Sequence, residues 1–414
     1  MKRLQTLLSY TLGIILPIGL LNMANAETVT LPTPNIVSST SGKPQPYVTP
    51  TAPQLDAKSY ILVDANSGAV LAEHNADEIL EPASLTKLMT VYLASEALAE
   101  ERLKPDDEIL ISEKAWRTGG SRTFIKVGDK IKALDLIQGI VVQSGNDASV
   151  ALAEYLAGSE SSFVDLMNHK AQQLGMKSSN FRNSTGLPSQ DHYSTARDLA
   201  ILTQAIIDDY PNDYQWYRQK WFTFNGIRQP NRNRLLWRNP LVDGLKTGHT
   251  DRAGYCLVSS AQKDGMRLIS IVLGASSDNA RTEDSQRLLT YGFRFFESHQ
   301  LYPTAKPIQY HRIWKSRNKQ IALGVTDDLY ITIPNGQLDN IRVDLDVPPT
   351  LYAPIKKGQT VGHISVYLND TLLSKTPVVA LNEAPKGNLF HQLRDMIAQT
   401  FYGLLQRIGI KASA

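Results

Sequence analysis

A nearly all-apolar helix that opens with a serine and a lysine is the feature that most constrains this chain. The stretch from Leu88 to Leu98 is apolar on almost every side, which predicts a helix buried in the middle of a domain. Ser84 and Lys87 stand three residues apart at its start, so their side chains share one face and can meet. The field at a helix N-terminus favours a developing alkoxide, and burial can lower a lysine pKa until the amine acts as a base. The pair is therefore a candidate activated nucleophile.

The Ser-x-x-Lys pattern is a weak indication when it stands alone. The chain repeats it at Ser260–Lys263 and at Ser316–Lys319, where polar neighbours predict surface positions for both. For Ser84 and Lys87 the alternative to chemistry is a serine that caps the helix and a lysine that is solvated. Other parts of the sequence must decide between these two interpretations.

The N-terminus has the form of an export signal. Two basic residues precede an apolar run over residues 12–21, and an Ala-Asn-Ala cleavage site ends at Ala26. The apolar run is short for a bilayer span, although an uncleaved N-terminal anchor is the alternative. We therefore expect a signal peptide over residues 1–26 and an exported protein. Residues 27–54, rich in Thr, Pro and Ser, predict a flexible lead-in.

The order of the following elements predicts an α+β domain over residues 55–300. A chain of 414 residues is too long for one ordinary core. Strand-like runs at 59–64 and 69–73 predict a hairpin, and helical spacing dominates from 81 to about 210. A second hairpin over 253–273 precedes a closing helix. The first and last strands can pair into one antiparallel sheet flanked by helices, with the helical block as an inserted subdomain.

Two smaller units are expected after this domain. Alternating stretches separated by turns predict a small all-β domain over residues 301–384, a spacer or a partner-binding module. Residues 385–414 predict a terminal unit whose amphipathic helix spans 388–411. Its apolar face is formed by Leu389, Phe390, Leu393, Met396, Ile397, Phe401, Leu404, Leu405 and Ile408. The helix carries too many charges to span a bilayer but fits a membrane interface; a helix docked on its own domain is the alternative.

Composition excludes several other kinds of protein. The formal net charge of +3 gives no reason to expect a nucleic-acid partner. The single cysteine, Cys256, excludes an intramolecular disulfide. The eight histidines form no metal-binding pattern, and no glycine-rich phosphate loop is present. We therefore expect neither a metal nor another cofactor.

Two short motifs strengthen the chemical interpretation of Ser84. Ser144-Gly145-Asn146 offers a hydroxyl that can relay a proton and an amide that can hold a substrate amide. Lys246-Thr247-Gly248 enters a strand region, where its glycine lets a ligand backbone approach closely and its other side chains supply a cation and a hydroxyl. Each motif is common by chance, but the three together are a strong signal.

The motifs, in this order, resemble the signature of penicillin-binding proteins and serine β-lactamases. Over roughly residues 55 to 410 the chain resembles the low-molecular-mass penicillin-binding proteins that act as D-alanyl-D-alanine carboxypeptidases. The segments that carry this resemblance are Ser67-Gly68, Glu81-Pro82-Ala83-Ser84, Gly186-Leu187, Tyr193-Ser194-Thr195-Ala196-Arg197-Asp198, His249-Thr250 and Tyr291-Gly292-Phe293. The resemblance implies an enzyme at the periplasmic face of the inner membrane, attached peripherally through its C-terminal helix. It also implies the fold of this superfamily, peptidoglycan stem peptides as substrates and covalent binding of β-lactam antibiotics.

The resemblance further implies roles for the residues around the nucleophile. Ser84 would attack the carbonyl between the two terminal D-alanines of a stem pentapeptide and become acylated, while Lys87 takes its proton. Ser144 would help to deliver a proton to the leaving D-alanine, and Asn146 would hold the substrate's amide. Lys246 would tune the site electrostatically.

A second group of residues is implied to bind the substrate. Thr247 would contact the terminal carboxylate beside Gly248, and the oxyanion would lie on the backbone N–H groups of Ser84 and His249. Arg281 falls where the family places an arginine that serves the carboxylate; a plain surface position is the alternative for it.

Two departures from the family and three other functions remain to be weighed. The stretch from Arg117 to Phe124 is more basic than the corresponding family loop, which puts substrate contacts there in doubt. No Glu-x-x-x-Asn pattern stands between Asn146 and Lys246, which favours a peptidase whose penicilloyl adduct turns over slowly.

The alternatives to a carboxypeptidase are a D,D-endopeptidase, a weak β-lactamase and a non-catalytic scaffold that binds the cell wall.

Overall fold

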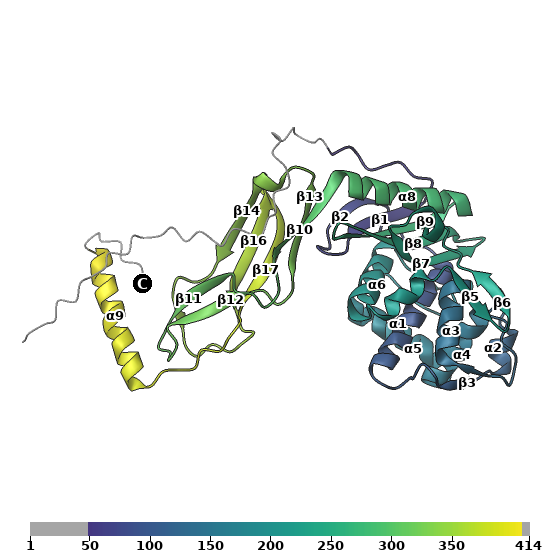
Figure 1. Ribbon diagram of the computed structural model, residues 1–414, viewed down its shortest axis with the longest axis horizontal. Helices are drawn as coiled ribbons and strands as arrows, with labels where there is room; N and C mark the ends of the chain where they lie inside the picture. Colours follow the sequence, from purple (N-terminus) through teal and green to yellow (C-terminus); the bar gives the residue numbers. More distant parts are fainter. Residues whose placement is uncertain (1–48, 408–414) are drawn as a thin grey trace, which may run out of the picture.

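A five-stranded antiparallel sheet organises the first unit of the molecule, as the computed structural model shows (Figure 1). The structure describes residues 49–407, so the expected signal peptide and residues 408–414 lie outside it. In spatial order the strands are β2 (Val70–His74), β1 (Ser59–Asp64), β9 (Met266–Ala275), β8 (Gly254–Lys263) and β7 (Val242–Thr250). The pairing of β1 with β9 confirms that the first and last strands of the domain share one sheet.

Alternation along the strands gives this sheet two apolar faces, as a period of two requires. Ile61 and Ile271 lie in a core shared with the helical block, whereas Leu62 and Val272 pack on the opposite side with Leu288 of the closing helix. The closing helix is α8 (Asp278–Phe295), and the helices of the other face include α1 (Lys87–Ala99), α4 (Asn146–Ala157) and α6 (Ala196–Asp209). Figure 1 shows the sheet between these two layers, and the expected α+β architecture is confirmed.

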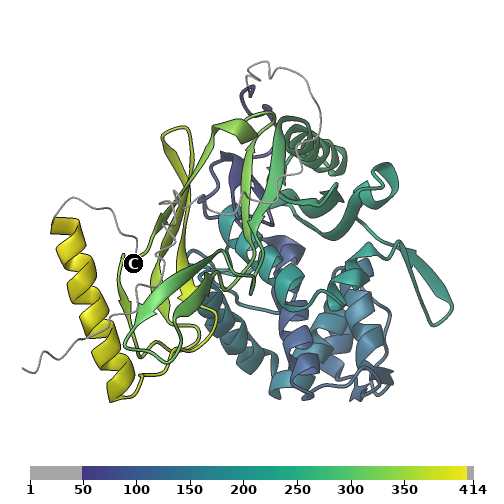
Figure 2. The ribbon, with the colours of Figure 1, turned by 60° about the vertical axis from the view of Figure 1, so that its left-hand side comes forward.

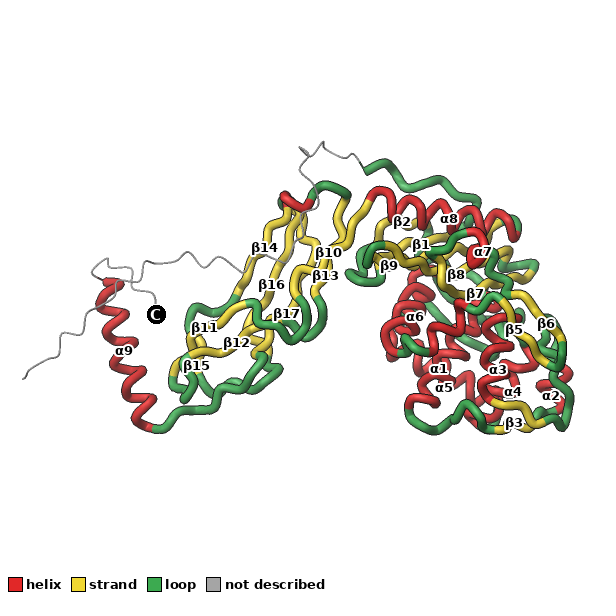
Figure 3. Tube along the Cα trace, viewed as in Figure 1, coloured by secondary structure: helices red, strands yellow, loops and turns green. Residues whose placement is uncertain are grey.

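The inserted block is less uniformly helical than its sequence indicates. Its further helices are α2 (Glu113–Arg117), α3 (Ala133–Gln138) and α5 (Glu160–Leu174), with short helical segments η1 (Ala83–Thr86), η2 (Gly139–Gln143) and η3 (Asp213–Arg218). The short helix α7 (Leu235–Arg238) packs instead on the face of the sheet that α8 covers. Two small hairpins, β3 (Glu108–Leu110) with β4 (Lys130–Lys132) and β5 (Trp221–Phe224) with β6 (Ile227–Pro230), were not expected. Figure 3 shows both as short strands at the edge of the helical block. Strands of three or four residues are too short to show a reliable period.

The expectation for the two repeated Ser-x-x-Lys patterns is wrong for their serines. Ser260 and Ser316 are fully buried, although Lys263 and Lys319 are exposed as expected. Ser260 accepts a hydrogen bond from Arg267 within the sheet, and Ser316 donates one to the carbonyl of Pro385. The polar neighbours of these serines in sequence gave no sign that paired strands and neighbouring segments of the chain cover their hydroxyls. Neither serine has a buried lysine beside it in its own pattern.

The second unit is all-β and begins directly after α8. Its strands are β10 (Phe296–Tyr302), β11 (Gln309–Trp314), β12 (Gln320–Gly324), β13 (Leu329–Pro334), β14 (Ile341–Asp346), β15 (Leu351–Tyr352), β16 (Thr360–Leu368) and β17 (Thr371–Ala380), with a turn η4 (Leu338–Asn340). β10 pairs with β13, and the other six strands form a separate sheet. Because β10 already belongs to this unit, the change of unit precedes the expected boundary at 301. Thr332 donates a 2.6 Å hydrogen bond to Asp64 and so connects the two units.

The C-terminal helix α9 (Leu389–Arg407) stands beside the β unit, at the end of the molecule far from the first unit (Figures 1 and 2). It touches the β unit through polar groups: Asp395 accepts from the backbone N–H of Lys315 at 2.7 Å, and Gln399 donates to the Tyr352 hydroxyl. Its apolar side chains Leu389, Phe390, Leu393, Met396 and Ile397 are each more than half exposed. Among the described residues, no helix is both long and apolar enough to cross a membrane.

Candidate active site

Ser84 lies in the tight turn η1, directly ahead of the buried helix α1. Pro82 opens the turn with φ −75°, which suits proline, and Ala83 has a left-handed φ of +47°. Lys87 is the first residue of α1 itself. The serine therefore precedes the α-helix by one turn of 3-10 geometry, slightly outside the α-helical turn that the sequence predicts. The strained backbone at Ala83 fixes how this turn meets its neighbours.

The Lys87 amine is buried and surrounded by acceptors. Its Nζ lies 3.1 Å from Ser84 Oγ and 2.7 Å from Asn146 Oδ1, and it also donates to the carbonyl of Thr185. Burial, with a smaller contribution from the cation of Arg232, lowers its pKa to about 7, while Asp147 opposes the shift. A neutral amine has two N–H groups and one lone pair. Since Asn146 Oδ1 and the Thr185 carbonyl only accept, they occupy both N–H groups and leave the lone pair for the Ser84 hydroxyl.

The Ser144-Gly145-Asn146 motif joins the irregular turn η2 to the start of α4. Ser144 has a left-handed φ of +65°, and its Oγ is buried without a hydrogen-bond partner among the described residues. Asn146 donates from Nδ2 to the Gly119 carbonyl at 2.7 Å, which fixes the orientation of its amide. The motif thus contains one buried hydroxyl without a partner among the described residues, while the Asn146 amide bridges Lys87 to the loop of residues 117–124.

The Lys246-Thr247-Gly248 motif lies on β7, the edge strand beside the serine turn. A Cβ at Gly248 would approach the Pro82 carbonyl to 3.0 Å, so glycine allows β7 and η1 to pack this closely. Lys246 is buried, and its Nζ donates to the Thr247 carbonyl at 3.1 Å. Burial holds the Lys246 pKa well below its usual range, and the cations of Lys87, Arg232 and Arg281 act in the same direction.

His249 lies near the end of β7, and Arg281 lies on α8. The His249 side chain is exposed, and its ring lies 4.0 Å from that of Tyr255. Arg281 is buried, so the alternative of a plain surface position is wrong. Its Nη1 donates to the Gly248 carbonyl at 2.9 Å and its Nη2 pairs with Asp278, while its Nε is buried without a partner among the described residues. The guanidinium therefore supports the strand end that carries Thr247.

A neighbouring turn supplies a group that sequence reasoning missed. The Thr185 carbonyl receives the Lys87 amine, and the adjacent Gly186 has a φ of +80°. A Cβ at Gly186 would lie 1.8 Å from the Ala83 carbonyl, so only glycine lets this turn pack on η1. Gly186 was noticed in the sequence, but a backbone carbonyl has no side-chain signature. Thr185 could not be identified from composition or spacing.

His192 is a second residue that the sequence did not single out. Its Nδ1 accepts from the backbone N–H of Arg182, so its Nε2 donates to the hydroxyl of Thr86 at 2.8 Å. Burial lowers its pKa to about 4, and the Lys87 cation contributes to the same shift. A neutral imidazole therefore braces the turn that holds Ser84.

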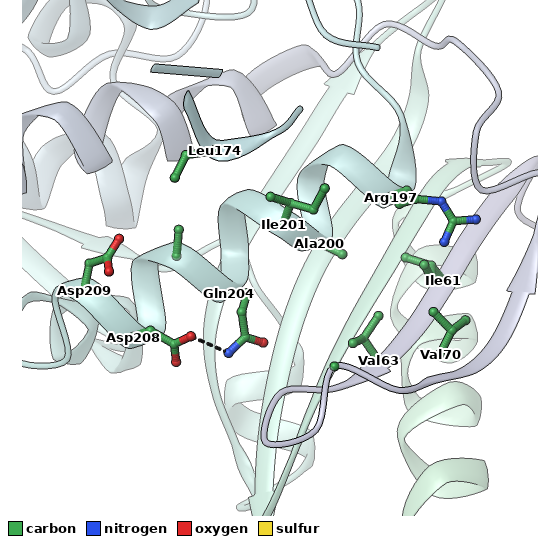
Figure 4. Close-up of a pocket in the computed structure, with 12 residues that line it drawn as sticks. Ile61, Val63, Val70, Leu174, Arg197, Ala200, Ile201, Gln204, Asp208 and Asp209 are labelled. Atoms are coloured by element: carbon green, nitrogen blue, oxygen red, sulfur yellow. Dashed lines mark hydrogen bonds between the residues drawn. The ribbon is translucent and has the colours of Figure 1, made fainter. Parts of the chain in front are cut away.

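One hollow of the first unit does not coincide with this chemistry. It has a volume of about 520 Å³ and lies between α6 and the β1–β2 hairpin (Figure 4). Apolar side chains such as Ile61, Val63 and Ile201 line it, and Arg197 and Asp208 lie at its ends. Its lining residues include none from the three motifs. Since reactive groups and not hollow size define a catalytic site, we place the candidate site at Ser84.

Comparisons with known proteins identify relatives that match most of this chain. The sequence profile described as D-alanyl-D-alanine carboxypeptidase matches residues 47–277, and the one described as penicillin-binding protein 5, C-terminal domain, matches residues 296–386. The chain is 45% identical to D-alanyl-D-alanine carboxypeptidase DacA of Escherichia coli (strain K12), over 85% of this chain and 90% of that protein. It is also 45% identical to DacC of the same strain, over the same shares of both chains. The crystal structure of penicillin binding protein 5 from Haemophilus influenzae has a TM-score of 0.78 at 40% identity and covers 82% of this chain and 100% of its own.

Proposed function

This chain belongs to the D-alanyl-D-alanine carboxypeptidase family, and from that premise we propose that Ser84 is the residue that the substrate acylates. The enzyme is a hydrolase, a D-alanyl-D-alanine carboxypeptidase. One observation carries the proposal for Ser84: its hydroxyl is 3.1 Å from the buried Lys87 amine, whose N–H groups are directed to other acceptors. A buried, uncharged amine in this position is a base for the serine hydroxyl.

The reaction then follows from the groups that surround Ser84. Lys87 removes the hydroxyl proton as Oγ attacks the carbonyl carbon of the penultimate D-alanine, and a tetrahedral intermediate forms. The C–N bond breaks, and the amine of the terminal D-alanine leaves with a proton that passes through the Ser144 hydroxyl. That hydroxyl is buried and has no partner among the described residues, so it is free for this transfer. Water hydrolyses the resulting ester and restores the serine.

The substrate is positioned by the edge of β7 and its neighbours. The backbone N–H groups of Ser84 and His249 hold the oxyanion, and Thr247 contacts the terminal carboxylate. Arg281 supports the strand end beside Thr247 through its hydrogen bond to the Gly248 carbonyl, and Lys246 tunes the electrostatics of the site from the same strand. The Asn146 amide holds the substrate's own amide and keeps Lys87 in place. Support for this arrangement is that Gly248 brings β7 against the serine turn.

The substrates are peptidoglycan stem pentapeptides, and β-lactams acylate the same serine. We expect rapid release of D-alanine from a diacetyl-L-lysyl-D-alanyl-D-alanine peptide and slower cleavage of a cross-linked peptidoglycan dimer, by at least about tenfold. The reason is that Thr247 is buried at the strand end, so a leaving group bulkier than D-alanine fits poorly. Chromatography of both reactions measures the two rates. Faster cleavage of the dimer would establish the endopeptidase alternative instead.

The helix α9 attaches the exported enzyme to the periplasmic face of the inner membrane. Its exposed apolar side chains, described above, and its few polar contacts with the β unit support this proposal. Deleting residues 388–414 is expected to move the protein from the membrane pellet to the soluble fraction. Activity on a soluble peptide should stay within about twofold, because α9 is far from α1, which Ser84 directly precedes (Figure 1).

Substitutions separate membrane binding from other effects of the deletion. Leu393→Asp/Ile397→Asp, on the exposed face of α9, should release the protein as the deletion does. The control Leu372→Asp/Leu373→Asp changes two exposed leucines of β17 and should leave it in the pellet. A truncated protein that still sediments with membranes would show that α9 is not the anchor.

A further inference from the structure

The β5–β6 hairpin and α7 present an aromatic and cationic surface to solvent. Phe222 and Phe224 point into the core of the first unit, so alternation turns Trp221 outward. The Trp221 ring meets that of Trp237 on α7 edge to face at 6.1 Å, and the Arg228 guanidinium lies 4.1 Å above the Trp221 ring. Both tryptophans are more than two-fifths exposed. Trp221, Trp237, Arg228 and Lys220 are called the tryptophan surface below.

The segment of chain that forms this surface carries charge of one sign. From 214 to 242 the chain contains no Asp or Glu, and its cationic residues are Arg218, Lys220, Arg228, Arg232, Arg234 and Arg238. All of them are exposed. Among the described residues only Arg234 forms an ion pair, with Asp278. Exposed cations without carboxylate partners attract an anionic ligand, and exposed tryptophan faces attract a ligand with flat apolar faces.

The tryptophan surface lies next to the candidate active site. The hairpin packs against η2, the turn that ends at Ser144. The segment after the hairpin is tied to β7, because Asn233 donates to the Gly244 carbonyl at 3.0 Å. A polymer held on the hairpin can therefore extend from the site itself.

The position of the tryptophan surface in the molecule favours a cell-wall polymer over a lipid surface as its ligand. Figures 1 and 2 show the β5–β6 hairpin at the end of the molecule opposite to α9. If α9 lies on the membrane, the tryptophan surface faces away from it. The anionic polymer on that side is peptidoglycan, whose stem peptides carry carboxylates and whose glycan presents sugar rings.

We propose that the tryptophan surface binds the glycan strand of peptidoglycan next to the stem peptide that is being trimmed. Sugar rings pack on Trp221 and Trp237, and Arg228 and Lys220 face the carboxylates of neighbouring stem peptides. The proposal rests on the proposed function and deepens it, because it makes the polymer, and not the isolated peptide, the preferred substrate.

The double variant Trp221→Ala/Arg228→Ala tests this proposal in the otherwise intact chain. Its co-sedimentation with purified, insoluble pentapeptide-rich peptidoglycan should weaken about tenfold, as for the loss of one aromatic contact and one charge. Release of D-alanine from that polymer should fall to a similar extent. Release from diacetyl-L-lysyl-D-alanyl-D-alanine should stay within about twofold, because this peptide has no glycan to lose contact with. Wild-type binding to the polymer should also weaken with added salt.

A matched control removes an exposed aromatic and an exposed cation from the second unit. Tyr310→Ala/Lys357→Ala should bind and trim the polymer like the wild type. Equal losses on polymer and short peptide would overturn the proposal, since they would show a structural effect on the site. Unchanged polymer binding would overturn it too, as would a loss confined to binding of phosphatidylglycerol vesicles. Failure of the proposed function itself would differ, because the wild type would then release no D-alanine from either substrate.

Discussion

Ser84→Ala is expected to reduce D-alanine release from a diacylated D-alanyl-D-alanine peptide by about 10⁴-fold or more, because the covalent route is lost. Alanine retains the turn η1 and removes only the oxygen that lies 3.1 Å from Lys87 Nζ. The free energy of unfolding should change by about 1 kcal/mol or less, since the hydroxyl is partly exposed and makes one hydrogen bond. Release assays and thermal melting measure the two effects separately.

Ser316, a buried serine in another Ser-x-x-Lys pattern, serves as the control. Ser316→Ala removes a hydroxyl that donates to the Pro385 carbonyl, in the second unit. It should lower the melting temperature slightly and leave D-alanine release within about twofold. If Ser84→Ala kept more than a tenth of the wild-type rate while folded, another residue would have to be the nucleophile.

Lys87→Met is expected to slow acylation by a labelled penicillin by about 10³-fold, within the range for loss of a positioned base. Methionine fills the apolar space but leaves Asn146 Oδ1 and the Thr185 carbonyl without their donor. The wild-type acylation rate should rise with pH and level off above about 7, since Lys87, whose pKa is about 7, must be neutral to accept the proton. The variant should lack this rise, and stopped-flow measurements from pH 5 to 9 compare the two profiles.

Stability should follow the same titration in the same direction, because burial favours the neutral form of Lys87. Between its folded pKa of about 7 and its ordinary value of 10.5, the unfolded chain binds a proton that the folded chain does not. The wild type should therefore gain stability relative to Lys87→Met as pH rises through this window. Lys319→Met, at an exposed position, is the control for both measurements. A wild-type acylation rate that stays flat from pH 5 to 9 would contradict the role of Lys87 as the base.

The sequence predicted the architecture where local pattern and tertiary structure agree. Strand-like runs at 59–64 and in the hairpin over 253–273 indicated strands, and β1 and β9 do pair. The all-apolar stretch from Leu88 indicated burial, and α1 is buried. The small hairpins were missed because strands such as β3, Glu108–Leu110, are too short to show a period.

The sequence predicted the members of the candidate site that contribute side chains in recognisable motifs. It did not predict the members that contribute a backbone carbonyl or that depend on tertiary packing. Spacing selected Ser84, Lys87 and Lys246, and the fold brings their strand and turn together. The Thr185 carbonyl has no sequence signature, and burial of Arg281 depends on α8 packing over β7 and β8. Burial of Ser260 likewise depends on strands that pair across the sheet.

Mass spectrometry of the wild-type enzyme after incubation with a labelled penicillin tests the central claim most directly. Proteolysis of the adduct locates the modified residue without any assumption about which serine reacts. The proposed mechanism predicts one penicilloyl group per chain, on the peptide that contains Ser84. Modification of another residue, or no covalent adduct in a folded protein, would contradict it.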